Sequence, residues 1–223
     1  MQTKNTLLLG IIFIIVFLVI FALVAYGVTA SFDDSVFTFI NSGLNVNSLN
    51  FFFIVATNYG REYFWIPVVM LLWLFGKKNE KRAALVLVIV FIILIITGEA
   101  LKYGYYRARP PLSLSNALLL VPLDSDSSFP SGHALIVMGG AVVSLLMLRK
   151  RYSLPLLTEA LVVCYSRIYV GVHYPMDVLG GAVLGAGVAL TVAYILLNAS
   201  IFESFFNSLV RTYNEVLHRM HLI

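Results

Sequence analysis

Charged side chains are scarce in this chain. Asp, Glu, Lys and Arg make up 12% of its 223 residues, whereas 60% of the residues are hydrophobic. A soluble domain does not accommodate that much apolar surface with so few charges, so the composition predicts an integral membrane protein. The formal net charge is only +4. Because membrane proteins collect Lys and Arg at their cytoplasmic face, this excess indicates no nucleic-acid partner.

Cysteine is nearly absent as well. The single cysteine, Cys164, lies in an apolar run and has no second cysteine with which to form an intramolecular disulfide. Its simplest interpretation is a small buried hydrophobic side chain. The sequence also lacks a Cys/His or multi-carboxylate cluster with the spacing of metal ligands. It therefore predicts neither a metal ion nor another cofactor.

Long apolar runs dominate the chain, and each of about 17–25 residues is long enough to cross a membrane. The predicted fold class is all-α: a polytopic membrane helical bundle of six transmembrane helices with additional interfacial helices. We expect a single domain over residues 1–223. The six predicted spans cover about 7–28, 60–76, 83–104, 132–149, 154–171 and 175–198.

Three further segments are predicted to lie at the membrane surface. Residues 31–34 are predicted to form a polar break before a short interfacial helix over 36–44. The apolar stretch 49–57 is too short for a span and is predicted to be a re-entrant or interfacial piece. The tail 200–223 places Phe and Leu at helical spacing among polar residues, which predicts an amphipathic surface helix.

The distribution of Lys and Arg predicts the orientation. The basic loops 77–82 and 149–151, together with Lys4, Arg211 and Arg219, fall on one side, which should be cytoplasmic, as should both termini. The remaining basic residues lie on the opposite side: Arg61, Lys102, Arg107, Arg109 and Arg167. Cations placed against this trend usually serve a function.

Residues that could bind or react with a phosphoryl group lie on the same side of the membrane as these five cations. Lys102 and Arg109 are seven apart, so they share one helix face until Pro110 ends the helix. Taken singly, each also fits an ordinary cation at a helix end. The turn Pro130-Ser131-Gly132-His133 opens a helix whose free N–H groups favour an anion such as phosphate.

The last group of residues flanks the start of the sixth span. Arg167 lies in an apolar segment, where an unpaired guanidinium is costly, so it needs an anionic partner. Asp177 lies four residues after His173, so its carboxylate can hold one imidazole nitrogen and leave the other free as a nucleophile. Cations, a donor-rich helix start, two histidines and a carboxylate can together bind, attack and protonate a phosphoryl ester.

These residues match a known pattern. The first motif is Lys102 followed after six residues by Arg109-Pro110, and the second is Pro130 to His133. The third is Ser166-Arg167, followed after five residues by His173 and after three more by Asp177. This order over 102–177 resembles the signature motifs of the type 2 phosphatidic acid phosphatase superfamily. That superfamily includes integral membrane lipid phosphate phosphatases and the vanadium haloperoxidases. The resemblance implies a metal-independent helical phosphatase with its site near one membrane surface.

The resemblance also implies a role for each matched position. His173 would attack phosphorus to give a phosphohistidine, Asp177 would orient it, and His133 would protonate the leaving group. The phosphate oxygens would be bound by Lys102, Arg109, Ser131, Gly132 and Arg167. The expected substrate is a lipid phosphate or diphosphate, such as an isoprenyl or undecaprenyl diphosphate, phosphatidic acid or phosphatidylglycerol phosphate. The expected location is the cell membrane, with the active site on the extracytoplasmic side.

Two other functions compete with hydrolysis. A transporter or flippase would use the same cations to bind an anionic lipid headgroup, but it does not explain two histidines and a paired Asp. Haloperoxidase chemistry shares the motifs but does not suit membrane spans. Some roles stay open: Arg61 and Glu62 line a headgroup entrance or anchor a span, Glu99 pairs with Lys102 or faces a cleft, and Glu159 has no evident partner. Asp124 and Asp126 would repel phosphate, so we expect them to face solvent.

Overall fold

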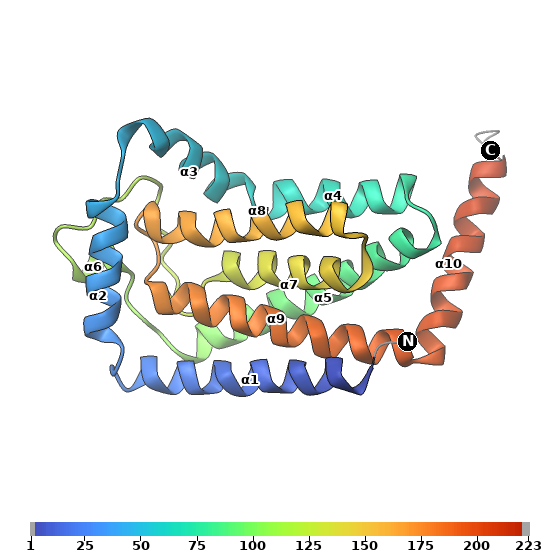
Figure 1. Ribbon diagram of the computed structural model, residues 1–223, viewed down its shortest axis with the longest axis horizontal. Helices are drawn as coiled ribbons and strands as arrows, with labels where there is room; N and C mark the ends of the chain where they lie inside the picture. The colour runs from blue at the N-terminus through green and yellow to red at the C-terminus, as the bar shows by residue number, and fades with distance from the viewer. Residues whose placement is uncertain (1–2, 220–223) are drawn as a thin grey trace.

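The computed structural model describes residues 3–219, and it is a bundle of helices that run along one long axis (Figure 1). The long helices of the bundle are α1 (Lys4–Ala25), α4 (Glu62–Phe75), α5 (Lys78–Gly104), α7 (Gly132–Met147), α8 (Lys150–Tyr169) and α9 (Pro175–Asn198). They correspond in order to the six predicted spans, and the all-α fold class is confirmed.

Shorter elements cover one end of the bundle. They are α2 (Ala30–Thr38), the π-helical turn η1 (Phe39–Gly43), α3 (Asn47–Tyr59) and α6 (Pro110–Ser113). At the opposite end α10 (Ser200–Arg219) crosses the bundle (Figure 1). The helix predicted for the tail is therefore present, and residues 220–223 of that prediction lie outside the described part. The polar break predicted at 31–34 is wrong, because these residues belong to α2, where the Asp33 side chain is fully buried.

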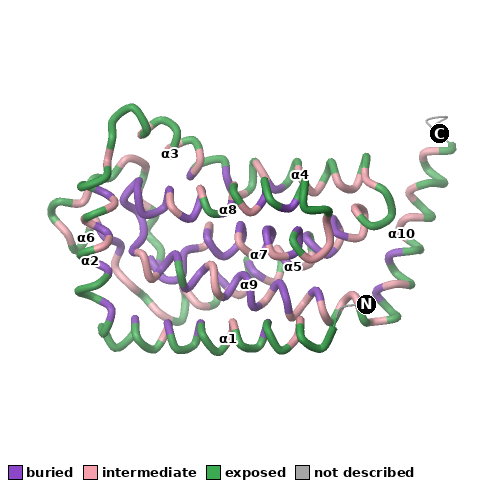
Figure 2. The backbone as a smooth tube through the Cα atoms, in the orientation of Figure 1, coloured by how far each residue is buried: buried purple, intermediate pink, exposed green. Residues whose placement is uncertain are grey.

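Within residues 3–219, three helices are long and apolar enough to cross a membrane, namely α1, α5 and α9. A fourth span results if the bent pair of Ala30–Gly43 and Asn47–Tyr59, at 119° to each other, counts as one. The apolar helices α4 and α7 are shorter. Many large apolar residues of α1 and α4 are exposed, as a lipid-facing surface requires. Figure 2 marks exposed residues along both helices in green. The number of six spans stays a prediction.

The core is the contact between α7 and α9, and small residues set its spacing. A side chain at Gly185 of α9 would collide with the backbone carbonyl of Leu135 in α7, so these two backbones lie in direct contact. Such close approach through glycine is common between membrane helices. It brings the first turns of both helices together, and the Ser131 backbone N–H donates to the carbonyl of Asp177 at 3.0 Å. The packing thus joins two of the predicted motifs.

Candidate active site

The predicted site residues gather at the end of the bundle that α2 and α6 cover. Lys102 lies in the last turn of α5, His133 in the first turn of α7, and Asp177 in the first turn of α9. Arg167 lies in the last turn of α8, and His173 follows it in the loop that leads to α9. That loop turns at Gly171, whose φ of +91° is unfavourable for other residues.

Arg109 reaches the site by a different route from the one predicted. Helix α5 ends at Gly104, so Arg109 does not share a helix face with Lys102. It sits instead in extended backbone directly before Pro110, where a helical conformation is disfavoured. Its guanidinium is 1% exposed and donates to the Val172 carbonyl at 3.0 Å. The extended segment therefore carries Arg109 across to the loop of His173.

His173 is held in one tautomer by its neighbours. Arg109 Nη1 lies 3.3 Å from His173 Nε2, and since a guanidinium only donates, Nε2 must be the accepting nitrogen. The proton then resides on Nδ1, which lies 3.4 Å from Ser128 Oγ and 3.6 Å from Asp177 Oδ2. The lone pair of Nε2 consequently points at Arg109, one of the cations that the sequence predicts to bind phosphate.

The electrostatic setting keeps this imidazole neutral. Burial disfavours its charged form, and the charges of Arg167, Arg109 and Lys102 act in the same direction, so the pKa of His173 lies well below its usual value. A neutral imidazole whose Nε2 carries no proton is the form that acts as a nucleophile.

The carboxylate of Asp177 is fully buried and is held by groups that the sequence motifs do not include. Ser128 Oγ donates to Asp177 Oδ2 at 2.5 Å, and Arg107 Nη1 donates to Oδ1 at 2.5 Å. Arg107 Nη2 also donates to the buried Asp33 at 2.6 Å. Two observations in the sequence are consistent with this cluster. Arg107 lies on the predicted extracytoplasmic side of the membrane, which disfavours cations, and Asp33 interrupts an apolar region.

Asp126 contradicts the expectation that it faces away from the site. Its carboxylate accepts hydrogen bonds from Lys102 and from Arg109 Nη2, the latter at 2.5 Å. Partial burial alone raises the pKa of this carboxyl, but the two cations outweigh burial and lower the pKa to about 2. Asp126 is therefore ionised at neutral pH and occupies the cations that were predicted to bind phosphate.

Because Asp126 competes with an anion for Lys102 and Arg109, Asp126→Asn is expected to tighten phosphate binding. Its side chain is partly exposed, so we expect a modest effect, with KM for the substrate and Ki for inorganic phosphate falling roughly two- to five-fold. Steady-state kinetics in detergent measures both, with Glu215→Gln in the exposed part of α10 as control. Weaker phosphate binding in Asp126→Asn would show that Asp126 supports the site.

Two buried donors remain unused next to these residues. The Arg167 guanidinium is 4% exposed and donates through Nη1 to Thr57 Oγ1 at 2.6 Å, but its Nε finds no partner within residues 3–219. In the same part of the chain Ser131 Oγ is buried without a partner. Unpaired buried donors are costly, and both belong to the predicted phosphate-binding set. A bound anion would satisfy them.

An apolar groove opens beside the cations. It has a volume of about 400 Å³, and Lys102 and Gly132 form its polar end together with Arg61. Most of its remaining lining is apolar and comes from α4, α5 and α7: Trp65, Ile66, Val69, Met70, Val88, Phe91, Ile92, Leu94, Ile95, Leu135 and Ile136. Glu62 and Glu99 also lie in the lining. An apolar groove that ends in a cluster of cations fits an amphiphile with an anionic head.

The fold and this site define the class of a membrane protein that binds a phosphoryl group. Comparison with known proteins leads to the same class. A model of the PAP2 superfamily matches residues 82–201. An undecaprenyl-diphosphatase of Sulfolobus acidocaldarius is 42% identical over 71% of this chain and 75% of its own length. The undecaprenyl-diphosphatase BcrC of Bacillus subtilis is 29% identical, over 69% of this chain and 77% of its own.

A solved structure shows the same fold. The crystal structure of the first transmembrane PAP2 type phosphatidylglycerolphosphate phosphatase from Bacillus subtilis matches with a TM-score of 0.68 at 24% identity, over 83% of this chain and 94% of that one. The chain therefore belongs to the PAP2 superfamily, and it is a membrane lipid phosphatase of that type.

Proposed function

We propose that this chain, as a single domain, removes the terminal phosphate of a polyprenyl diphosphate without a metal ion. The observation that carries the proposal is the geometry of His173, whose unprotonated Nε2 faces Arg109 while Nδ1 faces Ser128 and Asp177. The names of two relatives, both undecaprenyl-diphosphatases, support the choice of a long isoprenoid diphosphate. The apolar groove beside Lys102 provides space for part of its chain.

The reaction proceeds in two displacements. His173 Nε2 attacks the terminal phosphorus, the bond to the bridging oxygen breaks, and His133 donates its proton to that oxygen. The oxygens of the transferred group are bound by Lys102, Arg109, Arg167, Ser131 and the Gly132 N–H. Asp177 stabilises the positive charge that develops on His173. A water molecule, deprotonated by His133, then attacks the phosphohistidine and releases inorganic phosphate and neutral His173.

His133 is placed for its role by the first turn of α7. It directly follows Gly132, which lines the groove together with Lys102 and Arg61. The donor of the leaving-group proton must stand on the far side of phosphorus from the nucleophile. We assign this role to His133, which follows the groove-lining Gly132 in α7, because Asp177 lies on the Nδ1 side of the His173 ring.

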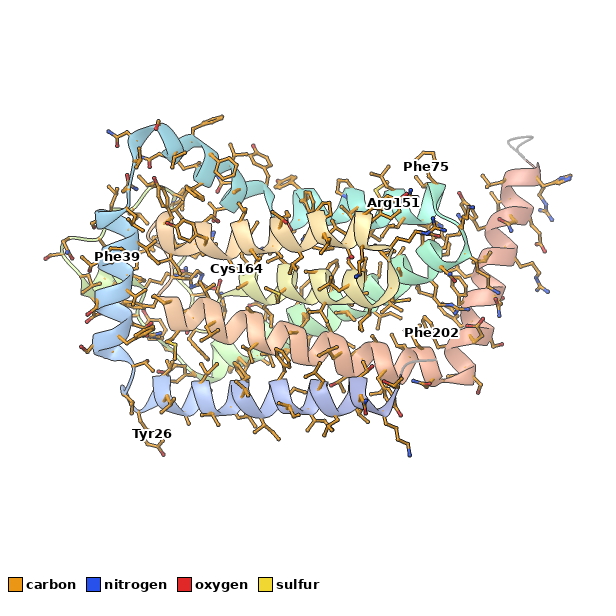
Figure 3. All side chains as sticks on the ribbon, in the orientation of Figure 1. Tyr26, Phe39, Phe75, Arg151, Cys164 and Phe202 are labelled. Atoms are coloured by element: carbon orange, nitrogen blue, oxygen red, sulfur yellow. The ribbon has the colours of Figure 1, made fainter. Side chains whose placement is uncertain are left out.

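The proposed orientation puts this site on the extracytoplasmic side, with both termini in the cytoplasm. The basic segments 77–82 and 149–151, which form the beginnings of α5 and α8, lie at the α10 end of the bundle, where Figure 3 shows Arg151 and Phe202. Phe39 marks the opposite end, which holds α2, α6 and the site. The positive-inside rule supports cytoplasmic exposure of the α10 end.

Phosphate release by detergent-solubilised protein in EDTA tests the proposal. The panel compares a polyprenyl diphosphate, phosphatidic acid and phosphatidylglycerol phosphate. We expect the highest kcat/KM for the polyprenyl diphosphate, with one phosphate and one polyprenyl monophosphate formed per turnover. Preference for phosphatidylglycerol phosphate or phosphatidic acid would reassign the substrate. Stoichiometric lipid binding without any release would favour a transporter or flippase.

A further inference from the structure

Arg61 is a cation at the site that none of the signature motifs includes. It precedes α4, and its Nη1 lies 3.6 Å from the point where a β-carbon on Gly132 would sit. Lys102 Nζ lies 3.9 Å from the same point. The guanidinium of Arg61, just before α4, and the ammonium of Lys102, in α5, therefore face the same turn of α7. Arg61 and Lys102 also line the groove together.

A place in the groove lining distinguishes Arg61 from Arg109 and Arg167, and Arg61 shares it with Lys102. Arg109 is buried beside His173, on the side where the transferred phosphoryl group is attacked. Arg61 instead lines the groove, next to apolar residues such as Trp65 and Ile66 of its own helix α4. A ligand whose reacting group lies at His173 and whose chain lies in the groove would bring the group between them near Arg61 and Lys102.

Arg61 has unused capacity to bind an anion. Its ion pair with the adjacent Glu62 is its one salt bridge in the described chain, and its Nε is buried without a hydrogen-bond partner there. A guanidinium presents several N–H donors in a fork that matches the oxygens of a phosphate. Glu62 and Glu99 line the same groove, and Glu62 is the carboxylate that a bound anion would have to replace at Arg61.

We propose that Arg61 binds the phosphate that stays on the lipid, and that it thereby selects a diphosphate over a monophosphate ester. This inference rests on the proposed function. In a diphosphate the second phosphate adjoins the reacting one on the side of the lipid chain, which is where Arg61 stands. A phosphatidic acid places an uncharged glycerol ester there and gains nothing from the guanidinium. During turnover the second phosphate takes the place of Glu62 as the partner of Arg61.

The test compares kcat/KM for a polyprenyl diphosphate and for phosphatidic acid in mixed micelles. Loss of a charge-assisted hydrogen bond to phosphate predicts that Arg61→Ala lowers the value for the diphosphate roughly 10- to 100-fold. For phosphatidic acid the loss is expected to be at least ten times smaller. Arg61→Lys, which keeps the charge, should restore part of the selectivity. Arg211→Ala on exposed α10 is the matched control.

A second variant does not depend on how well Arg61→Ala folds. Glu62→Gln frees Arg61 from its carboxylate partner, so KM for the diphosphate is expected to fall while KM for phosphatidic acid changes little. Equal effects of Arg61→Ala on both substrates, or an unchanged KM for the diphosphate in Glu62→Gln, would overturn the inference alone. A wild-type protein that releases no phosphate from the diphosphate would overturn the proposed function, and the inference with it.

Discussion

His173→Ala is expected to lower kcat for phosphate release by roughly three orders of magnitude or more, as loss of a covalent nucleophile does in other enzymes. The side chain is 1% exposed, and its Nε2 is the unprotonated ring nitrogen, which faces Arg109. Asp126 and Asp177 cannot replace it, because both carboxylates are engaged by arginines. Phosphate release in EDTA measures the loss, and His218→Ala in the last turn of α10 is the matched control.

A trapping experiment separates the role of His173 in catalysis from one in folding. Wild-type protein mixed with substrate labelled in the terminal phosphate and quenched in base should carry label on one histidine. The N–P bond of phosphohistidine survives base and is lost in acid. His173→Ala should bind labelled substrate yet carry no such label. Label retained in His173→Ala, or unimpaired phosphate release, would contradict His173 as the nucleophile.

Helix positions follow from the sequence because the bilayer imposes them. A backbone within hydrocarbon must satisfy its own hydrogen bonds, so each long apolar run of this chain becomes a helix. The predicted spans at 83–104 and 175–198 lie within or coincide with the observed α5 and α9. The motifs also fall at helix ends, as predicted, since Gly132 opens α7 and Pro175 opens α9. Local rules of helix initiation were therefore sufficient to predict where α7 and α9 begin.

The loops were predicted less well, because their contacts depend on partners far away in sequence. Asp126 was expected in solvent by considering phosphate alone, but in the folded chain it meets Lys102 and Arg109. Arg109 was placed on a continued α5, but the helix ends at Gly104 and an extended segment follows. That segment is held by Ser128, whose N–H donates to the Arg107 carbonyl at 2.9 Å. No local pattern reveals such a pairing.

Arg107→Met is expected to destabilise the protein by about 3–5 kcal/mol, the usual cost of leaving a buried charge without its partner. The methionine would leave the buried carboxylates of Asp33 and Asp177 without the guanidinium that bridges them. Activity should fall as well, because Asp177 would lose the bond at Oδ1 that fixes its orientation towards His173. Thermal unfolding in detergent and kcat for phosphate release measure the two effects.

Removal of one carboxylate charge should rescue part of this loss. In the double variant Arg107→Met/Asp33→Asn the remaining Asp177 no longer faces a second buried negative charge. The amide oxygen of the introduced asparagine can still accept from the Met176 N–H, which lies 2.9 Å from Asp33 Oδ1 in the native protein. Arg211→Met, at an exposed ion pair of α10, is the control and should change stability by less than about 0.5 kcal/mol. A double variant no more stable than Arg107→Met would show that Arg107 acts through its packing on Tyr174, whose ring centroid lies 4.4 Å from the guanidinium, and not by bridging the two carboxylates.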